Sequence, residues 1–145
     1  ADGADRARFT RCQPAAPAAA HRPVLGQQRD GRMNTRIGLE YVVLRCVDLE
    51  RSRTFYEALG FDLVLEQHGT GVRHYSCNLG DVVVELYPTS ARQTSNVRLG
   101  LRISNIGGAI DALTRIGADV LRVDAGGSSA LVRDPDGHEI ALQSA

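Results

Sequence analysis

Residues 48–60 read DLERSRTFYEALG, and residues 105–117 read NIGGAIDALTRIG. Each stretch begins with a residue that favours the N-cap of a helix, Asp48 or Asn105, and each ends with a glycine, which commonly follows the last helical turn. The two capping residues are 57 positions apart (48 to 105), and so are the two final glycines. A shared offset between starts and stops predicts two helices that belong to an internal duplication.

Strand-like runs flank both predicted helices in the same order. One run precedes each helix, at 39–47 and 98–104, and three follow each, at 61–67, 72–79 and 82–87 in the first half and at 119–123, 129–133 and 139–143 in the second. Each half therefore has the order β-α-β-β-β. This order predicts an α+β domain with its helices on one side of a sheet.

Composition limits the kind of partner that the chain can have. The 145 residues include 17 basic and 17 acidic side chains, so the formal net charge is zero, and every basic residue is Arg. This balance gives no support for a nucleic-acid or membrane-surface partner, and the lack of Lys excludes lysine nucleophiles. No apolar run approaches the ~20 residues that cross a bilayer. We expect a cytoplasmic protein without nucleic-acid or membrane partners.

The first 32 residues differ from the rest of the chain. They contain three of the five prolines and the stretch PAAPAAA, and they show no hydrophobic periodicity. Their apolar content is too weak for the central region of a signal peptide. We expect residues 1–32 to be a disordered or non-native N-terminal extension, and residues 33–145 to form the folded domain.

The segment VRHYSCNLGDVVVELYP, residues 72–88, predicts a β-hairpin with distinct faces. If Gly80–Asp81 is a two-residue turn, Ser76 faces Glu85, and His74 faces Tyr87. The apolar face then consists of Tyr75, Cys77, Leu79, Val82, Val84 and Leu86, and the opposite face of His74, Ser76, Asn78, Val83, Glu85 and Tyr87. A one-residue change of register would exchange the faces.

The other strands alternate in the same way, so one face of the sheet is mixed and polar. The plainest interpretation is that this face meets water, but its tyrosines and valines are more typical of a ligand pocket. The predicted ligand-binding residues are Tyr41, Val43, His74, Ser76, Glu85, Tyr87, Arg98, Arg102, Glu139 and Ala141. Of the remaining reactive residues, we expect Cys46 and Cys77 to be buried, and His68 and His138 to lie at the surface beside turns.

The duplicated unit, together with DLERSRTFYEALGF at 48–61, GDVVVELYP at 80–88 and DPDGHEIAL at 134–142, resembles the vicinal-oxygen-chelate superfamily. This superfamily includes glyoxalase I, extradiol dioxygenases and the fosfomycin- and bleomycin-resistance proteins. The resemblance covers residues 33–145. It implies tandem βαβββ modules, about 37–88 and 96–145, in a curved mixed sheet that forms a cup with helices outside. It also implies a homodimer, because a second chain often completes the cup.

The resemblance further implies four metal-ligand positions, which fall on Tyr41, Glu85, Arg98 and Ala141. Glu85 alone is a good ligand, and the cation Arg98 is expected to repel a metal and pair with Glu85. A displaced site of His74, Glu85 and Tyr41 is disfavoured, because Tyr is a poor ligand for most divalent metals. We therefore expect no metal and no cofactor.

Two functions remain open at this point. The favoured one is a metal-free protein, closest in type to the bleomycin-resistance proteins, that sequesters an antibiotic or another amphipathic or anionic small molecule. The alternative is a metal-independent isomerase or lyase with His74 or Glu85 as base and Arg98 stabilising an oxyanion. An interaction module that uses the N-terminal segment has only composition in its favour.

Overall fold

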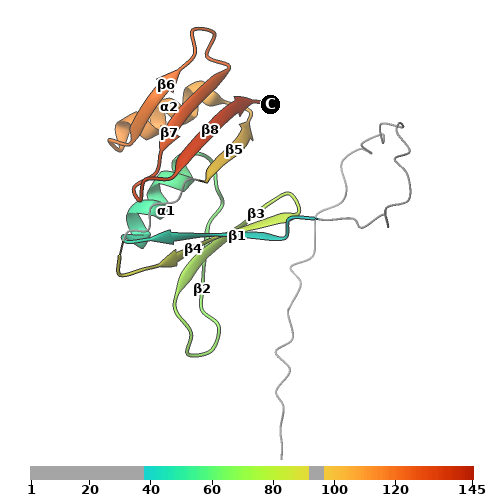
Figure 1. Cartoon of the computed structure of the whole chain (residues 1–145), viewed down its shortest axis with the longest axis vertical. Coiled ribbons are helices and arrows are strands. Elements are labelled where there is room, and N and C mark those ends of the chain that lie inside the picture. The colour runs from blue at the N-terminus through green and yellow to red at the C-terminus, as the bar shows by residue number, and fades with distance from the viewer. Residues whose placement is uncertain (1–37, 92–96) are drawn as a thin grey trace, which may run out of the picture. The chain divides into compact units, whose positions relative to one another are not determined.

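The computed structural model describes residues 38–91 and 97–145, which contain eight strands and two helices (Figure 1). In chain order these are β1 (Tyr41–Cys46), α1 (Leu49–Ala58), β2 (Val64–Glu66), β3 (His74–Leu79), β4 (Val82–Pro88), β5 (Arg98–Ile103), α2 (Ile106–Arg115), β6 (Asp119–Val123), β7 (Ser129–Arg133) and β8 (Glu139–Ser144). The duplicated β-α-β-β-β order is confirmed. The segment 1–32, expected to be an extension, lies outside the described residues.

The strands form two four-stranded sheets, one in each module. Their orders are β1-β4-β3-β2 and β5-β8-β7-β6. In each sheet the first strand pairs in parallel with the last strand of its module, and the other pairs are antiparallel. The predicted α+β class with two βαβββ modules is confirmed, with the strands arranged as two mixed sheets. No helix of the described residues has the length and apolar character needed to cross a membrane.

Both helices begin and end where the sequence predicts. The Asp48 side chain accepts a hydrogen bond from the backbone N–H of Arg51 at 3.0 Å, and the Asn105 side chain accepts one from Gly108 at 2.9 Å. These bonds satisfy N–H groups that have no partner within the helix. Gly60 and Gly117 have φ angles of +97° and +69°, which glycine adopts without the strain that a side chain would add.

The hairpin of β3 and β4 has the predicted register. Ser76 pairs with Glu85, and Leu79 pairs with Val82 across the two-residue turn. The strand expected over 61–67 is shorter, because the Phe61 backbone N–H donates to the carbonyl of Tyr56 and so turns back towards α1. The register of β3 with β4 fixes which side chains face away from the helices.

A single apolar cluster draws on both modules. Its buried members are Leu44, Cys46, Phe55, Tyr56, Leu59, Phe61, Tyr75, Cys77, Val84, Leu86, Ile106, Ala109, Leu113, Ala130, Val132, Ile140 and Leu142. The burial predicted for Cys46 and Cys77 is confirmed, and desolvation raises the pKa of the Cys46 thiol to about 12. Both cysteines therefore act as small apolar core residues rather than as reactive thiols.

The DPDGH turn between β7 and β8 bonds the second module to the first. Asp136 accepts hydrogen bonds from the Val47 backbone N–H at 2.8 Å and from the Ser52 hydroxyl at 3.0 Å. Asp134 accepts one from the Tyr56 hydroxyl at 2.7 Å. The surface position predicted for His138 is wrong: it is 7% exposed, and its Nδ1 lies 2.8 Å from a carboxylate oxygen of Asp134. The turn therefore links the two modules through buried hydrogen bonds.

Candidate functional site

Six of the ten predicted ligand-binding residues lie on the face of the first sheet that points away from α1. These are Tyr41, Val43, His74, Ser76, Glu85 and Tyr87. The strand register places Val43 and Ser76 on either side of Glu85. Because side chains alternate along a strand, residues opposite one another in register share a face. We call this surface, with its neighbours Arg45 and Glu66, the polar face of the first sheet.

His74, the first residue of β3, is buried on this polar face, with its side chain only 1% exposed. Its ring stacks on Tyr87, with the centroids 4.2 Å apart, and its Nδ1 lies 3.1 Å from the carbonyl oxygen of Val72. Since a carbonyl can only accept, Nδ1 carries the hydrogen. Its Nε2 has no hydrogen-bond partner among the described residues and lies 3.7 Å from Glu66 and 3.9 Å from Glu85. An unsatisfied ring nitrogen therefore faces two carboxylates.

Glu66 and Arg45 were not among the predicted binding residues. Glu66 lies opposite His74 in register, but β2 is a three-residue edge strand whose long connection to β3 leaves the register open from sequence. The Arg45 guanidinium lies 5.3 Å from the ring centroid of Tyr87. Arg45 alternates with Tyr41 and Val43 along the same strand, and this alternation could have placed Arg45 among the predicted binding residues. The two residues extend the polar face by one cation and one carboxylate.

The other four predicted residues lie on the second sheet. Arg98 donates from Nε to Glu139 at 2.9 Å and also from Nη2 to the same oxygen, so the predicted pairing of Arg98 with Glu85 is wrong. The reason is that Arg98 and Glu139 are directly opposite on β5 and β8, whereas Glu85 belongs to the other sheet. Ala141 lies opposite Gly100. The second sheet thus pairs Arg98 with Glu139, where a pair with Glu85 was expected, and leaves Arg102 exposed.

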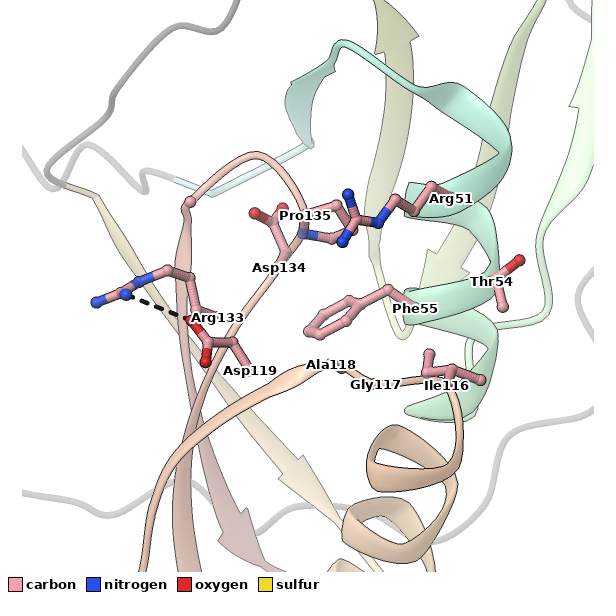
Figure 2. Close-up of a pocket in the computed structure, with 11 residues that line it drawn as sticks. Arg51, Thr54, Phe55, Ile116, Gly117, Ala118, Asp119, Arg133, Asp134 and Pro135 are labelled. Carbon is pink, nitrogen blue, oxygen red and sulfur yellow. Dashed lines mark ion pairs between the residues drawn. The ribbon is translucent and has the colours of Figure 1, made fainter.

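Three clefts of the described chain involve few of these residues. The largest, about 690 Å³, is mainly apolar and includes Arg102, and one of about 210 Å³ includes Val43. A third cleft, about 470 Å³, lies between α1, the residues after α2 and the DPDGH turn, with the ion pair of Asp119 and Arg133 at its edge (Figure 2). None of these three clefts is lined by predicted binding residues from both modules. The largest group of predicted binding residues lies instead on the polar face of the first sheet.

The sequence of residues 38–142 matches the family model described as Glyoxalase/Bleomycin resistance protein/Dioxygenase superfamily. The chain belongs to this superfamily. The match spans both βαβββ modules of the structure. No curated protein matches the sequence significantly.

Several solved structures are similar in fold to this chain. A hypothetical protein from S. aureus has a TM-score of 0.60 and 21% identity over 75% of this chain and 97% of its own. The fosfomycin resistance protein FosX from Mesorhizobium loti has a TM-score of 0.57 and 23% identity over 73% and 90%. The trypanothione-dependent glyoxalase I of Leishmania major has a TM-score of 0.60 and 17% identity over 75% and 87%. These likenesses establish the fold and leave the reaction open.

The residues at the four metal positions implied for the superfamily do not fit a metal ion. Glu85 alone offers a carboxylate, and Ala141 offers no donor atom. Arg98 is a permanent cation whose guanidinium is held by Glu139. A divalent ion needs several lone pairs in a closed geometry, which a single carboxylate beside a phenol cannot supply. No step of the function proposed below passes through a metal at these positions.

Proposed function

We propose that this protein binds an amphipathic small molecule, such as an antibiotic, on the polar face of the first sheet and that it needs no metal at the four implied positions. The observation that carries the proposal is the stack of His74 on Tyr87, with the Arg45 guanidinium over the same ring and the Glu85 carboxylate beside it. Rigid aromatic and polar groups on one face are typical of sites that orient a ligand.

The charges on this face favour a ligand that brings hydrogen-bond donors. Glu66 and Glu85 both present carboxylates, which accept only, and Arg45 is the cation placed among them. Arg98 is bonded to Glu139 on the second sheet, so it is less available to an anionic ligand. A flat apolar part can pack on the exposed ring of Tyr41 while a donor group reaches Glu85.

The alternative, a metal-independent isomerase or lyase, has less support. It needs Arg98 to stabilise an oxyanion near a base on the first sheet, but Arg98 donates two hydrogen bonds to Glu139 on the second sheet. An enzyme of this kind requires donors aimed at the developing charge. Without that group, the geometry supports binding better than catalysis.

The proposal is tested by thermal shift on EDTA-treated full-length protein with three probes: tryptamine, naphthoate and fosfomycin. A ligand at 100 times its Kd adds about 2.7 kcal/mol to the free energy of unfolding, so binding raises Tm. We expect tryptamine to give the largest shift. Tyr41→Ala and Glu85→Gln should reduce the shift, whereas Leu121→Ala, an exposed position on β6, should retain it.

Two results would contradict the proposal. One is a Tm that none of the three probes raises. The other is a shift that is equally large in the wild type, Tyr41→Ala and Glu85→Gln, because the bound probe would then lie elsewhere. Circular dichroism of each variant checks that the fold is retained.

We also propose that the protein acts as a homodimer. The support is that β1 and β5 each pair on one side only within the described residues, and that exposed apolar side chains lie on or beside β1. A second copy is the partner that the superfamily membership favours.

A further inference from the structure

Three metal-ligating side chains converge where β2 ends and β3 begins. Glu66 is the last residue of β2, His68 follows two positions later, and His74 opens β3. One carboxylate oxygen of Glu66 lies 3.6 Å from Nε2 of His68 and 3.7 Å from Nε2 of His74. One ligand atom from each of the three residues lies within 4.8 Å of the other two. None of the three is among the metal positions implied for the superfamily.

The state of His74 is a second, independent reason to look for a ligand here. Its Nε2 is buried and has no hydrogen-bond partner among the described residues. Burying an unsatisfied polar atom is unfavourable, and such an atom calls for an explanation. Its Nδ1–H donates to the Val72 carbonyl, and the ring stacks on Tyr87, so the lone pair of Nε2 has a fixed direction. Metal-binding histidines are commonly held by such a bond from the other ring nitrogen.

The two separations measured from Glu66 are close to those around a tetrahedral ion. Bonds from Zn²⁺ are about 2.0–2.1 Å to His nitrogen and about 2.0–2.2 Å to carboxylate oxygen, which places ligand atoms about 3.3–3.5 Å apart at the tetrahedral angle. The two Glu66 distances, 3.6 and 3.7 Å, exceed this spacing only slightly. Adjacent ligands of an octahedral ion with bonds of about 2.1 Å would lie about 3.0 Å apart, which is farther from the two Glu66 distances. The His68 side chain is 75% exposed, so it can make the small adjustment that closes the site.

We propose that Glu66, His68 and His74 bind one zinc-type divalent transition-metal ion, with the fourth position open to water. Two imidazoles and one carboxylate suit Zn²⁺, Co²⁺ or Ni²⁺, whereas Mg²⁺ and Ca²⁺ prefer oxygen ligands throughout. The ion ties the connection between β2 and β3 to the polar face of the first sheet. This site does not depend on the proposed small-molecule function.

The test is a zinc titration of EDTA-stripped full-length protein in competition with a chromogenic chelator. We expect one zinc per chain. Loss of an outer partner of a ligand costs about 10–100-fold in metal affinity, so loss of a ligand in His68→Ala or Glu66→Gln should cost more than about 100-fold. Both side chains are partly exposed, so the variants should fold, which circular dichroism can check.

Two control variants separate this site from others. The N-terminal segment holds candidate ligands of its own, Cys12 and His21, and His21→Ala tests whether they bind the zinc. If the site is at Glu66, His68 and His74, this variant should bind zinc as the wild type does. Tyr41→Ala should also keep the zinc affinity while losing small-molecule binding, so failure of one proposal is distinguishable from failure of the other. Cobalt in place of zinc should give the intense visible absorption of a four-coordinate site.

The inference is overturned if no zinc binds, if His68→Ala and Glu66→Gln bind it as tightly as the wild type, or if His21→Ala abolishes binding. A weak, six-coordinate cobalt spectrum would equally contradict the tetrahedral geometry. One equivalent of zinc, lost in both ligand variants and kept in both controls, would establish the site.

Discussion

Asp136 accepts hydrogen bonds from two groups that lie 84 and 89 positions earlier in the sequence. The donors are the backbone N–H of Val47, just after β1, and the hydroxyl of Ser52 on α1, which is fully buried. Asp134, two residues away, accepts from the Tyr56 hydroxyl on the same helix. Burial and the nearby carboxylate raise the pKa of Tyr56 well above its usual value, so Tyr56 remains a donor. The side chains of Asp134 and Asp136 therefore form hydrogen bonds between the two modules.

We expect Asp136→Ala to lower the free energy of unfolding by about 2–4 kcal/mol, because a buried hydroxyl and a partly buried N–H lose their acceptor. Urea denaturation followed by circular dichroism measures this change. The matched control is Asp111→Ala on the exposed side of α2, which should change stability by less than about 0.5 kcal/mol. If the two substitutions change the free energy of unfolding equally, then the hydrogen bonds of Asp136 add nothing to stability.

At the scale of one element, the first turn of α2 contains two adjacent glycines in different surroundings. A Cβ added at Gly107 would be 3.9 Å from the nearest atom of Asn105, an ordinary contact. A Cβ added at Gly108 would be 2.5 Å from the side-chain nitrogen of Asn105, closer than real contacts allow. Asn105 caps this helix by accepting from Gly108, so the second substitution must displace the cap.

We expect Gly107→Ala to raise the free energy of unfolding by about 0.5–1 kcal/mol, through higher helix propensity and a less flexible unfolded chain. Gly108→Ala should forfeit that gain, because loss of an Asn cap costs about 1 kcal/mol. Urea denaturation of both variants tests the difference. If the two substitutions stabilise the protein equally, then the Asn105 side chain can be displaced without cost, and its hydrogen bond to Gly108 contributes little to the free energy of unfolding.

Elements with local signals could be predicted from the sequence. The caps Asp48 and Asn105 lie within three residues of the N–H groups they bond, and the Gly80–Asp81 turn fixes the β3–β4 register, so the bounds of both helices and the two faces of the hairpin follow. The same register placed four candidate residues, His74, Ser76, Glu85 and Tyr87, on one face.

Features that depend on distant partners could not be predicted. The position of Glu66 beside His74 depends on the pairing of a short edge strand across a long connection. The burial of His138 depends on Asp134 and on its contact with Tyr56, 78 positions earlier. The bond of Arg98 to Glu139 depends on β5 pairing with β8 rather than on any spacing in the chain.

At the scale of the whole molecule, each sheet of the described residues ends in two edge strands that pair on one side only. β1 and β5 each lie at the end of their sheet's strand order. Leu39 and Tyr41 are 65% and 62% exposed, so apolar surface accompanies the unpaired edge of β1. An exposed strand edge with apolar side chains favours pairing with another chain unless something covers it.

A homodimer that covers β1 should give a light-scattering mass of twice the 15.6 kDa chain at micromolar concentration. Leu39→Glu places a charge beside that edge, and because a buried unpaired charge is strongly unfavourable, it should shift the mass towards that of one chain. Leu121→Glu puts the same charge on β6, where the side chain is 37% exposed, and should leave the dimer intact. A wild type that stays at 15.6 kDa would contradict the dimer, and dissociation by Leu121→Glu alone would move the interface to the other edge of the second sheet. Because the polar face of the first sheet borders β1, dissociation by Leu39→Glu with loss of ligand binding would show that a second copy completes the site.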